Sequence, residues 1–189
     1  MALSDLLRRL FSRSRSTPVS VPRPSPAPRS KTKSRLVVGG AATALMATVV
    51  AFVGDWEGMR HQAYIPIAGD VPTICYGSTK GVRIGDTKTK AECDALFGQE
   101  LVQFEAGMRK CIRNPDAVPD EVYVAFLSAS YNVGVGGFCK SSMARRLNAG
   151  DVRGACDALL LWNKSGGRVV QGLVNRRKAE RKLCLEGLR

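Results

Sequence analysis

The stretch GDWEGMRHQAYIPIAGDVPTICYGST, residues 54–79, decides the fold of this chain. Residues 55–64 can form a first helix, after which proline and glycine divide the chain into short runs, TICY at residues 73–76 and GVRI at residues 81–84. Short alternating runs between such breakers are typical of a small β-hairpin or meander. We therefore expect one helix followed directly by a small sheet.

The residues after this stretch have the pattern of a helical lobe. Thr89 and Glu92 form a capping box, and apolar residues recur behind them every three or four positions, which predicts a long amphipathic helix over residues 90–112. Two prolines end that helix, and Asp120 can cap another that runs to a glycine-rich break at residues 134–137. Shorter helices fit residues 142–148, 152–162 and 173–185. The fold class is therefore α+β and predominantly helical.

The N-terminal residues differ in composition from the rest. Residues 1–35 contain nine Lys or Arg and one Asp, a net charge of +8, and residues 12–34 are mostly Ser, Pro and Arg. Such a segment buries too little apolar surface to offset the entropy of ordering, so we expect a basic, disordered tail. No aromatic side chain is interleaved with the cations of residues 12–34, which argues against binding of nucleic acid.

Residues 36–53, LVVGGAATALMATVVAFV, carry no charge. As a helix these 18 residues would be about 27 Å long, near the minimum for the hydrocarbon core of a bilayer. The cations before them would keep the tail in the cytoplasm under the positive-inside rule. We predict a single transmembrane signal anchor at residues 36–53. A cleaved signal peptide is the alternative, although no small-residue cleavage motif follows Val53.

All the cysteines follow the predicted anchor. Their even number on the outward side of a membrane indicates disulfides formed in an oxidising compartment. Their spacing matches no zinc site, because the sequence has no Cys-x-x-Cys and only one histidine. Two of them near opposite ends of the predicted long helix, Cys93 and Cys111, would lie about 27 Å apart, too far for a bridge. We propose the pairs Cys75 with Cys93, Cys111 with Cys139, and Cys156 with Cys184.

Several separated motifs resemble the phage-type lysozymes, the T-even phage family of muramidases. WEGMR at residues 56–60 and PTICYGST at residues 72–79 resemble the family's glutamate helix and β-hairpin. YNVG at residues 131–134, FCKSS at 138–142, LNAGD at 147–151 and GLVNRRKAER at 172–181 resemble the C-terminal lobe of its endolysin branch. The resemblance covers residues 54–189. It implies a two-lobed lysozyme-like catalytic domain, with a β-hairpin sheet in the N-terminal lobe and a long connecting helix.

The resemblance also implies an activity. The expected function is that of an endolysin, which hydrolyses the β-1,4 bond between N-acetylmuramic acid and N-acetylglucosamine in peptidoglycan and so lyses the host cell. We expect peptidoglycan and the inner membrane as partners, no nucleic acid, no cofactor or metal, and a monomer. The resemblance to signal-anchor-release endolysins implies that this chain crosses the host inner membrane once, with its N-terminus in the cytoplasm, and is then released to the periplasm.

Glycoside hydrolysis requires a carboxylic acid to protonate the leaving oxygen and a second group to activate water or stabilise positive charge. The resemblance assigns the acid to Glu57. The family pattern of Glu, eight residues, Asp, five residues and Thr is not matched here, because Pro66 stands at the Asp position and Thr73 comes one residue late. We expect Asp70, the only carboxylate of this loop, to take over the aspartate's role and Thr73 to hold the water. The alternative for Asp70 is a simple turn former.

Five further residues have expected roles. The resemblance places Tyr131 and Ser141 at the sugar-binding cleft, and assigns the pair Arg176 and Arg177 to packing or lobe closure. Glu105 is expected to be a solvated charge on a helix face.

Two other functions stay open from the sequence. A lytic transglycosylase would use Glu57 as its only catalytic carboxyl and add no water to the product. A catalytically degenerate lysozyme fold would bind peptidoglycan from the membrane without cutting it.

Overall fold

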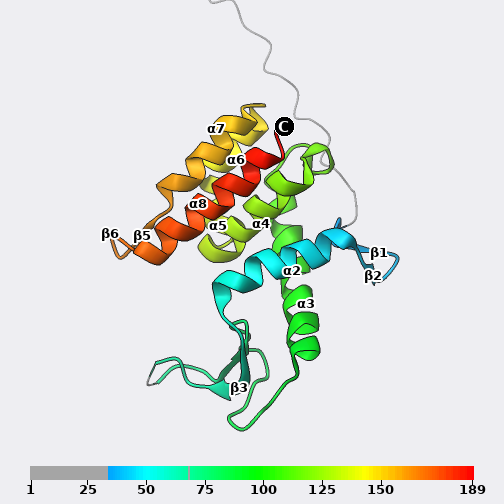
Figure 1. Ribbon diagram of the computed structural model, residues 1–189, viewed down its shortest axis with the longest axis vertical. Coiled ribbons are helices and arrows are strands. Elements are labelled where there is room, and N and C mark those ends of the chain that lie inside the picture. The colour runs from blue at the N-terminus through cyan, green and yellow to red at the C-terminus, as the bar shows by residue number, and fades with distance from the viewer. Residues whose placement is uncertain (1–33, 68) are drawn as a thin grey trace, which may run out of the picture.

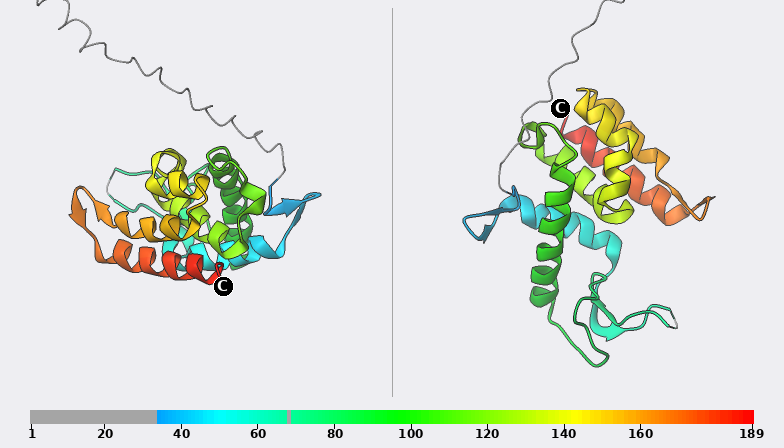
Figure 2. Two further views of the ribbon diagram at one scale, coloured as in Figure 1. Left: turned by 90° about the horizontal axis from the view of Figure 1, so that it is seen from above. Right: turned by 180° about the vertical axis from the view of Figure 1, so that it is seen from behind.

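The computed structural model describes residues 34–67 and 69–189 of the chain (Figure 1). Most of the predicted tail, residues 1–33, lies outside the described residues. The described chain forms two lobes, and the helix α3 (Lys90–Arg109) connects the small hairpin lobe to the larger helical lobe (Figures 1 and 2). The two-lobed, predominantly helical fold expected from the sequence is therefore confirmed.

The uncharged residues 36–53 are part of this fold. Two-residue strands, β1 (Val37–Val38) and β2 (Ala41–Ala42), pair as an antiparallel hairpin, and α2 (Ala44–Glu57) follows. The side chain of Thr43 caps α2 by accepting a hydrogen bond from the Met46 amide, as an N-cap threonine should. Contacts with α3 and with α4 (Asp120–Val133) bury one face of α2, on which Met46, Val49 and Val53 lie.

The expected first helix over residues 55–64 is wrong. α2 ends at Glu57, and residues 60–64 form strand β3 (Arg60–Tyr64). The cause is Gly58, which has a φ of 70° and so turns the chain out of the helix. The predicted boundary between residues 53 and 54 thus falls inside a helix. Within residues 34–67 and 69–189, none of the helices is long and apolar enough to cross a bilayer. The signal anchor therefore stays a prediction.

The hairpin lobe is built on two short strands. β3 pairs antiparallel with β4 (Thr73–Cys75), from Arg60 opposite Cys75 to Tyr64 opposite Thr73, with an irregular register between them. The run at residues 81–84, expected to be extended, forms no strand. A disulfide between Cys75 and Cys93 joins β4 to the first turn of α3, where the predicted capping box of Thr89 and Glu92 is present. α3 ends three residues earlier than predicted, at Arg109.

The helical lobe surrounds α4, in which nine consecutive residues, 122–130, are buried. The neighbouring helices are α5 (Val135–Lys140), α6 (Ser142–Asn148), α7 (Val152–Ala158) and α8 (Gln171–Glu186). The sequence predicted a glycine-rich break at α5, but only Gly134 acts as one, with a φ of 78°. The short elements of this lobe are η1 (Pro115–Ala117), η2 (Leu159–Leu161), β5 (Lys164–Ser165) and β6 (Arg168–Val169).

Both disulfides of the helical lobe have the predicted pairing. Cys111 is bonded to Cys139 and Cys156 to Cys184, with Cα atoms 5.3 and 5.7 Å apart. The first bond ties the end of α3 to α5, and the second ties α7 to α8. All three proposed pairs are thus confirmed.

Two valines of the predicted anchor test whether it belongs to the core. Val49 is fully buried, whereas Val38 is 65% exposed. We expect Val49→Ala to lower the free energy of unfolding by about 1 to 3 kcal/mol, since it removes buried methyl groups and leaves a cavity. Val38→Ala should change it by less than about 0.5 kcal/mol. Urea unfolding of the purified full chain measures both changes. Equal effects would place residues 36–53 outside the folded core.

Candidate active site

Glu57, the expected acid, is the last residue of α2 and lies where α2 meets the C-terminal helix. One carboxylate oxygen, Oε1, accepts a hydrogen bond from Nη1 of Arg176 on α8 at 2.7 Å. The Glu57 side chain is 20% exposed, so the ion pair is shielded while the carboxyl still reaches solvent. This position suits a group that must meet a substrate from outside.

Arg176 is held by a buried polar cluster of α4 and α8. Its Nε donates to Glu180 at 3.1 Å, and Nη2 donates to the backbone oxygen of Ser128 at 3.2 Å. The Ser128 hydroxyl donates to Glu180 at 2.6 Å. Burial raises the pKa of Glu180, while the neighbouring cations Arg177 and Arg176 act against that shift. The guanidinium that faces Glu57 is therefore fixed by groups on two helices.

Arg177, the next residue, is fully buried on the other side of Glu180. Its Nε lies 3.0 Å from Glu180 Oε2, and its Nη2 donates to Asn132 on α4 at 2.9 Å. Burial lowers the pKa of Arg177. These contacts join α8 to α4, in agreement with the packing role expected of Arg177.

Tyr131 on α4, expected in the cleft, packs against α3. Its hydroxyl donates to Glu100 at 3.2 Å, and its ring packs against Phe97 and Phe104. Burial raises the pKa of Tyr131, and the negative charges of Glu100 and Glu57 add to the shift. The hydroxyl of Tyr131 therefore stays protonated at neutral pH.

Thr73 and Asp70 lie in the hairpin lobe. Thr73 begins β4 and is buried, with its hydroxyl donating to the Val71 carbonyl at 3.1 Å. Asp70 is exposed; its carboxylate accepts from the Val71 amide, and its own amide donates to the Ile67 carbonyl, both at 2.9 Å. In the described part of the chain, no hydrogen bond or ion pair joins either residue to Glu57. The contacts of Asp70 are those of a turn, as in the alternative considered for it.

Ser141, the second expected cleft residue, is buried and caps α6, because its hydroxyl accepts from the Ala144 amide at 3.2 Å. Nothing in the sequence indicated that Arg176 contacts Glu57 directly, although Arg176 lies in the GLVNRRKAER motif. Sequence reasoning also missed Glu180, although it lies in the same motif, and Ser128, which no motif marks. Their roles arise only where α2, α4 and α8 meet.

The fold and the carboxylate at the end of α2 define a two-lobed glycoside hydrolase, and comparison with known proteins names the family. Residues 54–180 match the phage lysozyme family. The SAR-endolysin of Enterobacteria phage P21 is 38% identical over 154 residues, which are 79% of this chain and 92% of that protein. The SAR-endolysin of Pseudomonas phage phiKMV is 41% identical over 153 residues, 78% and 90% of the two chains.

A solved structure agrees with this match. The active form of P1 phage endolysin Lyz superposes with a TM-score of 0.66 at 28% identity, over 80% of this chain and 98% of that one. The chain therefore belongs to the phage lysozyme family. It is a lysozyme-type glycoside hydrolase, an endolysin that degrades peptidoglycan and lyses the host cell.

The contribution of the buried cluster around Arg176 to stability can be tested by mutation. We expect Arg176→Ala to lower the free energy of unfolding by about 3 to 5 kcal/mol, because Glu180 would stay buried with one cation removed. Arg181→Ala on the same helix breaks only an exposed ion pair, with Asp157, and should cost less than about 1 kcal/mol. Thermal and urea unfolding compare the two variants. Equal losses would show that the cluster contributes no more than a surface ion pair.

Proposed function

We propose that residues 36–53 hold this endolysin in the host inner membrane, with the N-terminus in the cytoplasm, and that the released, monomeric enzyme works in the periplasm. Its reaction is hydrolysis of the β-1,4 bond between N-acetylmuramic acid and N-acetylglucosamine. One observation carries the proposal: the uncharged residues 44–53 and the acid Glu57 belong to the same helix, α2. Residues 44–53 would therefore be part of the membrane span in the anchored form and part of α2 in the released form.

In the proposed mechanism, Glu57 is the general acid that protonates the leaving glycosidic oxygen. Arg176 orients its carboxyl through one oxygen, which leaves the other available to substrate. Asp70 acts as base for water or stabilises charge, and Thr73 helps to hold the water. Inversion at the anomeric carbon then requires the two carboxyls to lie about 6.5 to 9.5 Å apart around the substrate.

Substitution of the two carboxylates tests this assignment. Glu57→Gln keeps the shape but removes the acidic proton, so we expect it to abolish cleavage of purified peptidoglycan. Glu186→Gln makes the same change at an exposed position of α8 and should be neutral. Asp70→Asn should lower kcat by about a hundredfold or more, the size of a general-base contribution.

The outcomes separate the alternatives. Near-normal turnover of Asp70→Asn would leave Asp70 as a turn former only. Product mass distinguishes hydrolysis, which adds water, from transglycosylation, which does not. A wild-type chain that binds peptidoglycan without cutting it would refute the proposed hydrolysis.

Release from the membrane is favoured by the composition of the anchor. Gly, Ala and Thr replace many of the large apolar residues of a permanent span, and each CH₂ that leaves the bilayer costs only about 0.8 kcal/mol. Release also moves the cationic tail outward, and the inside-negative potential opposes this by about 2.3 kcal/mol per charge per 100 mV. With a net charge of +8 on residues 1–35, depolarisation removes a large barrier.

The solvent-facing side of α2 allows the anchor to be strengthened without touching the core. Ala44, Thr48 and Ala51 are exposed in the folded chain. We expect their joint replacement by leucine to keep the protein in the membrane fraction and delay lysis, even after an uncoupler is added. Replacement of the same three residues by serine is the matched control and should not delay release.

Two glycines of the anchor are less suitable for this test. Gly39 and Gly40 have φ values of 59° and 85°, so leucine there would also strain the β1–β2 hairpin of the released fold. Lysis by the leucine variant of α2 on the wild-type schedule, or a mature protein that starts near residue 54, would overturn the release proposal.

A further inference from the structure

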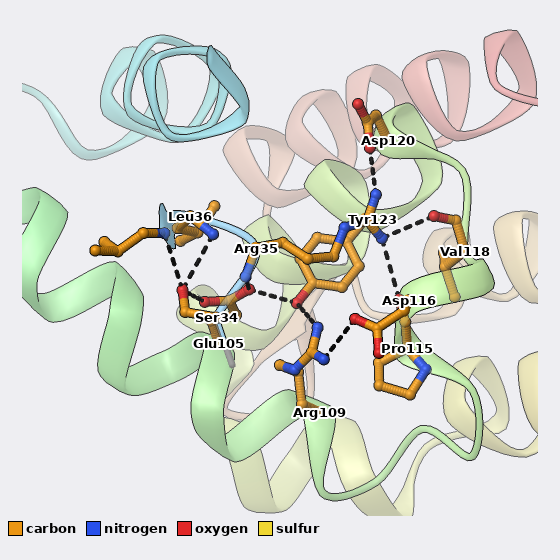
Figure 3. A network of polar contacts seen from close by, with 11 residues as sticks. Ser34, Arg35, Leu36, Glu105, Arg109, Pro115, Asp116, Val118, Asp120 and Tyr123 are labelled. Atoms are coloured by element: carbon orange, nitrogen blue, oxygen red, sulfur yellow. Dashed lines mark hydrogen bonds and ion pairs between the residues drawn. The ribbon is translucent and has the colours of Figure 1, made fainter. Parts of the chain in front are cut away.

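Glu105 on α3 is fully buried, which corrects the expectation of a solvated helix-face charge. Figure 3 shows its carboxylate beside the residues that precede β1. It accepts hydrogen bonds from the Ser34 hydroxyl, from the Arg35 amide at 2.7 Å and from the Tyr123 hydroxyl at 2.6 Å. Two of these three donors therefore come from the N-terminal end of the described chain.

Arg35 makes further contacts with the segment between α3 and α4. Its guanidinium donates to the backbone oxygens of Pro115 at 3.0 Å and Val118 at 2.8 Å, and pairs with Asp120 (Figure 3). It also lies 4.2 Å from the centre of the Tyr123 ring, in a cation–π arrangement. These contacts suit the planar guanidinium of an arginine that directly follows a serine.

These contacts continue into the helix that carries Glu57. The carbonyl of Arg35 accepts a hydrogen bond from the Thr43 hydroxyl at 2.8 Å, and the Leu36 carbonyl accepts one from the Thr43 amide at 2.9 Å. Thr43 in turn caps α2, whose last residue is Glu57. Docking of residues 34–36 on Glu105 therefore fixes the start of the helix that ends at the acid.

The membrane separates these partners in the anchored form. If residues 36–53 span the bilayer, Ser34 and Arg35 lie on the cytoplasmic side and Glu105 on the periplasmic side, about 30 Å away across the hydrocarbon core. Glu105 would then keep only Tyr123 among its three donors. A buried carboxylate that loses its partners is strongly destabilising.

We propose that Glu105, Tyr123 and Asp120 form a receptor for Ser34 and Arg35, a latch that closes only when the anchor has left the membrane and that positions α2 and Glu57 for catalysis. The proposal rests on the release proposed above. Arg35 and Glu105 are positioning residues in it, since neither contacts Glu57. Arg35 lies at the cytoplasmic end of the anchor before release. After release, its contacts hold the start of α2.

The test uses the full chain, collected from the periplasm after an uncoupler is added, with four variants. Arg35→Ala opens the latch, and Arg35→Lys keeps the charge without the planar fork. Glu105→Gln keeps an acceptor for the Arg35 amide and the Tyr123 hydroxyl, but it removes the charge and the acceptor for the Ser34 hydroxyl. The Ser34 oxygen cannot accept from the new amide instead, because it already accepts from the amides of Leu36 and Val37. Lys31→Ala removes the same charge from the tail at a position outside the described residues, and is the matched control.

We expect Arg35→Ala to lower kcat on purified peptidoglycan about tenfold, the size of one lost charge-assisted hydrogen bond, with KM unchanged. Amide hydrogen exchange should become faster in residues 44–57 but not in α8. Arg35→Lys should recover part of the loss. Glu105→Gln should lose part of kcat, and Lys31→Ala should match the wild type.

Two results would overturn the latch: Arg35→Ala with the kcat and hydrogen exchange of Lys31→Ala, or equally faster exchange in α2 and α8, which would indicate general destabilisation. Failure of the release proposal looks different. In that case the wild-type chain is never found in the membrane fraction, whatever the kcat of its variants.

Discussion

The ion pair between Glu57 and Arg176 joins residues 119 positions apart in the sequence, and the site depends on it. It connects the end of α2 to α8, and the cluster of Glu180 and Ser128 behind it fixes the cation. A charged group inside a protein needs partners with good geometry, so such a cluster tolerates few other arrangements of the three helices. The position of the acid is therefore a property of helix packing and not of its own loop.

A second buried carboxylate, Glu105, applies the same constraint near the other end of α2. There the partners are the residues just before β1, and Thr43 connects them to the helix. α2 is thus held by polar contacts near its start and at its last residue, with Val49 and Val53 buried between them. Apolar packing stabilises the helix against α3 and α4, while the two polar clusters hold its two ends in position.

Under the proposed release, the same residues must suit two environments. As a span, residues 36–53 need to be uncharged on every side; as part of the fold, one face of α2 is buried and the other meets water. Alanine and threonine satisfy both, because they cost little when exposed and carry no charge. This explains why the segment is uncharged and yet poor in large apolar side chains on the exposed face of α2.

Local chemistry allowed the sequence alone to determine much of this protein. The capping box at Thr89, the three disulfide pairs and the separated motifs of the endolysin branch all follow from short-range patterns or from resemblance, and the structure agrees with them. The sequence did not reveal that Glu57 ends a helix, because the uncharged run before it fits a membrane span equally well. Nor did it reveal that Glu105 is buried or that Arg176 faces Glu57. The last two facts depend on contacts between residues 70 and 119 positions apart, which only the packing of the helices decides.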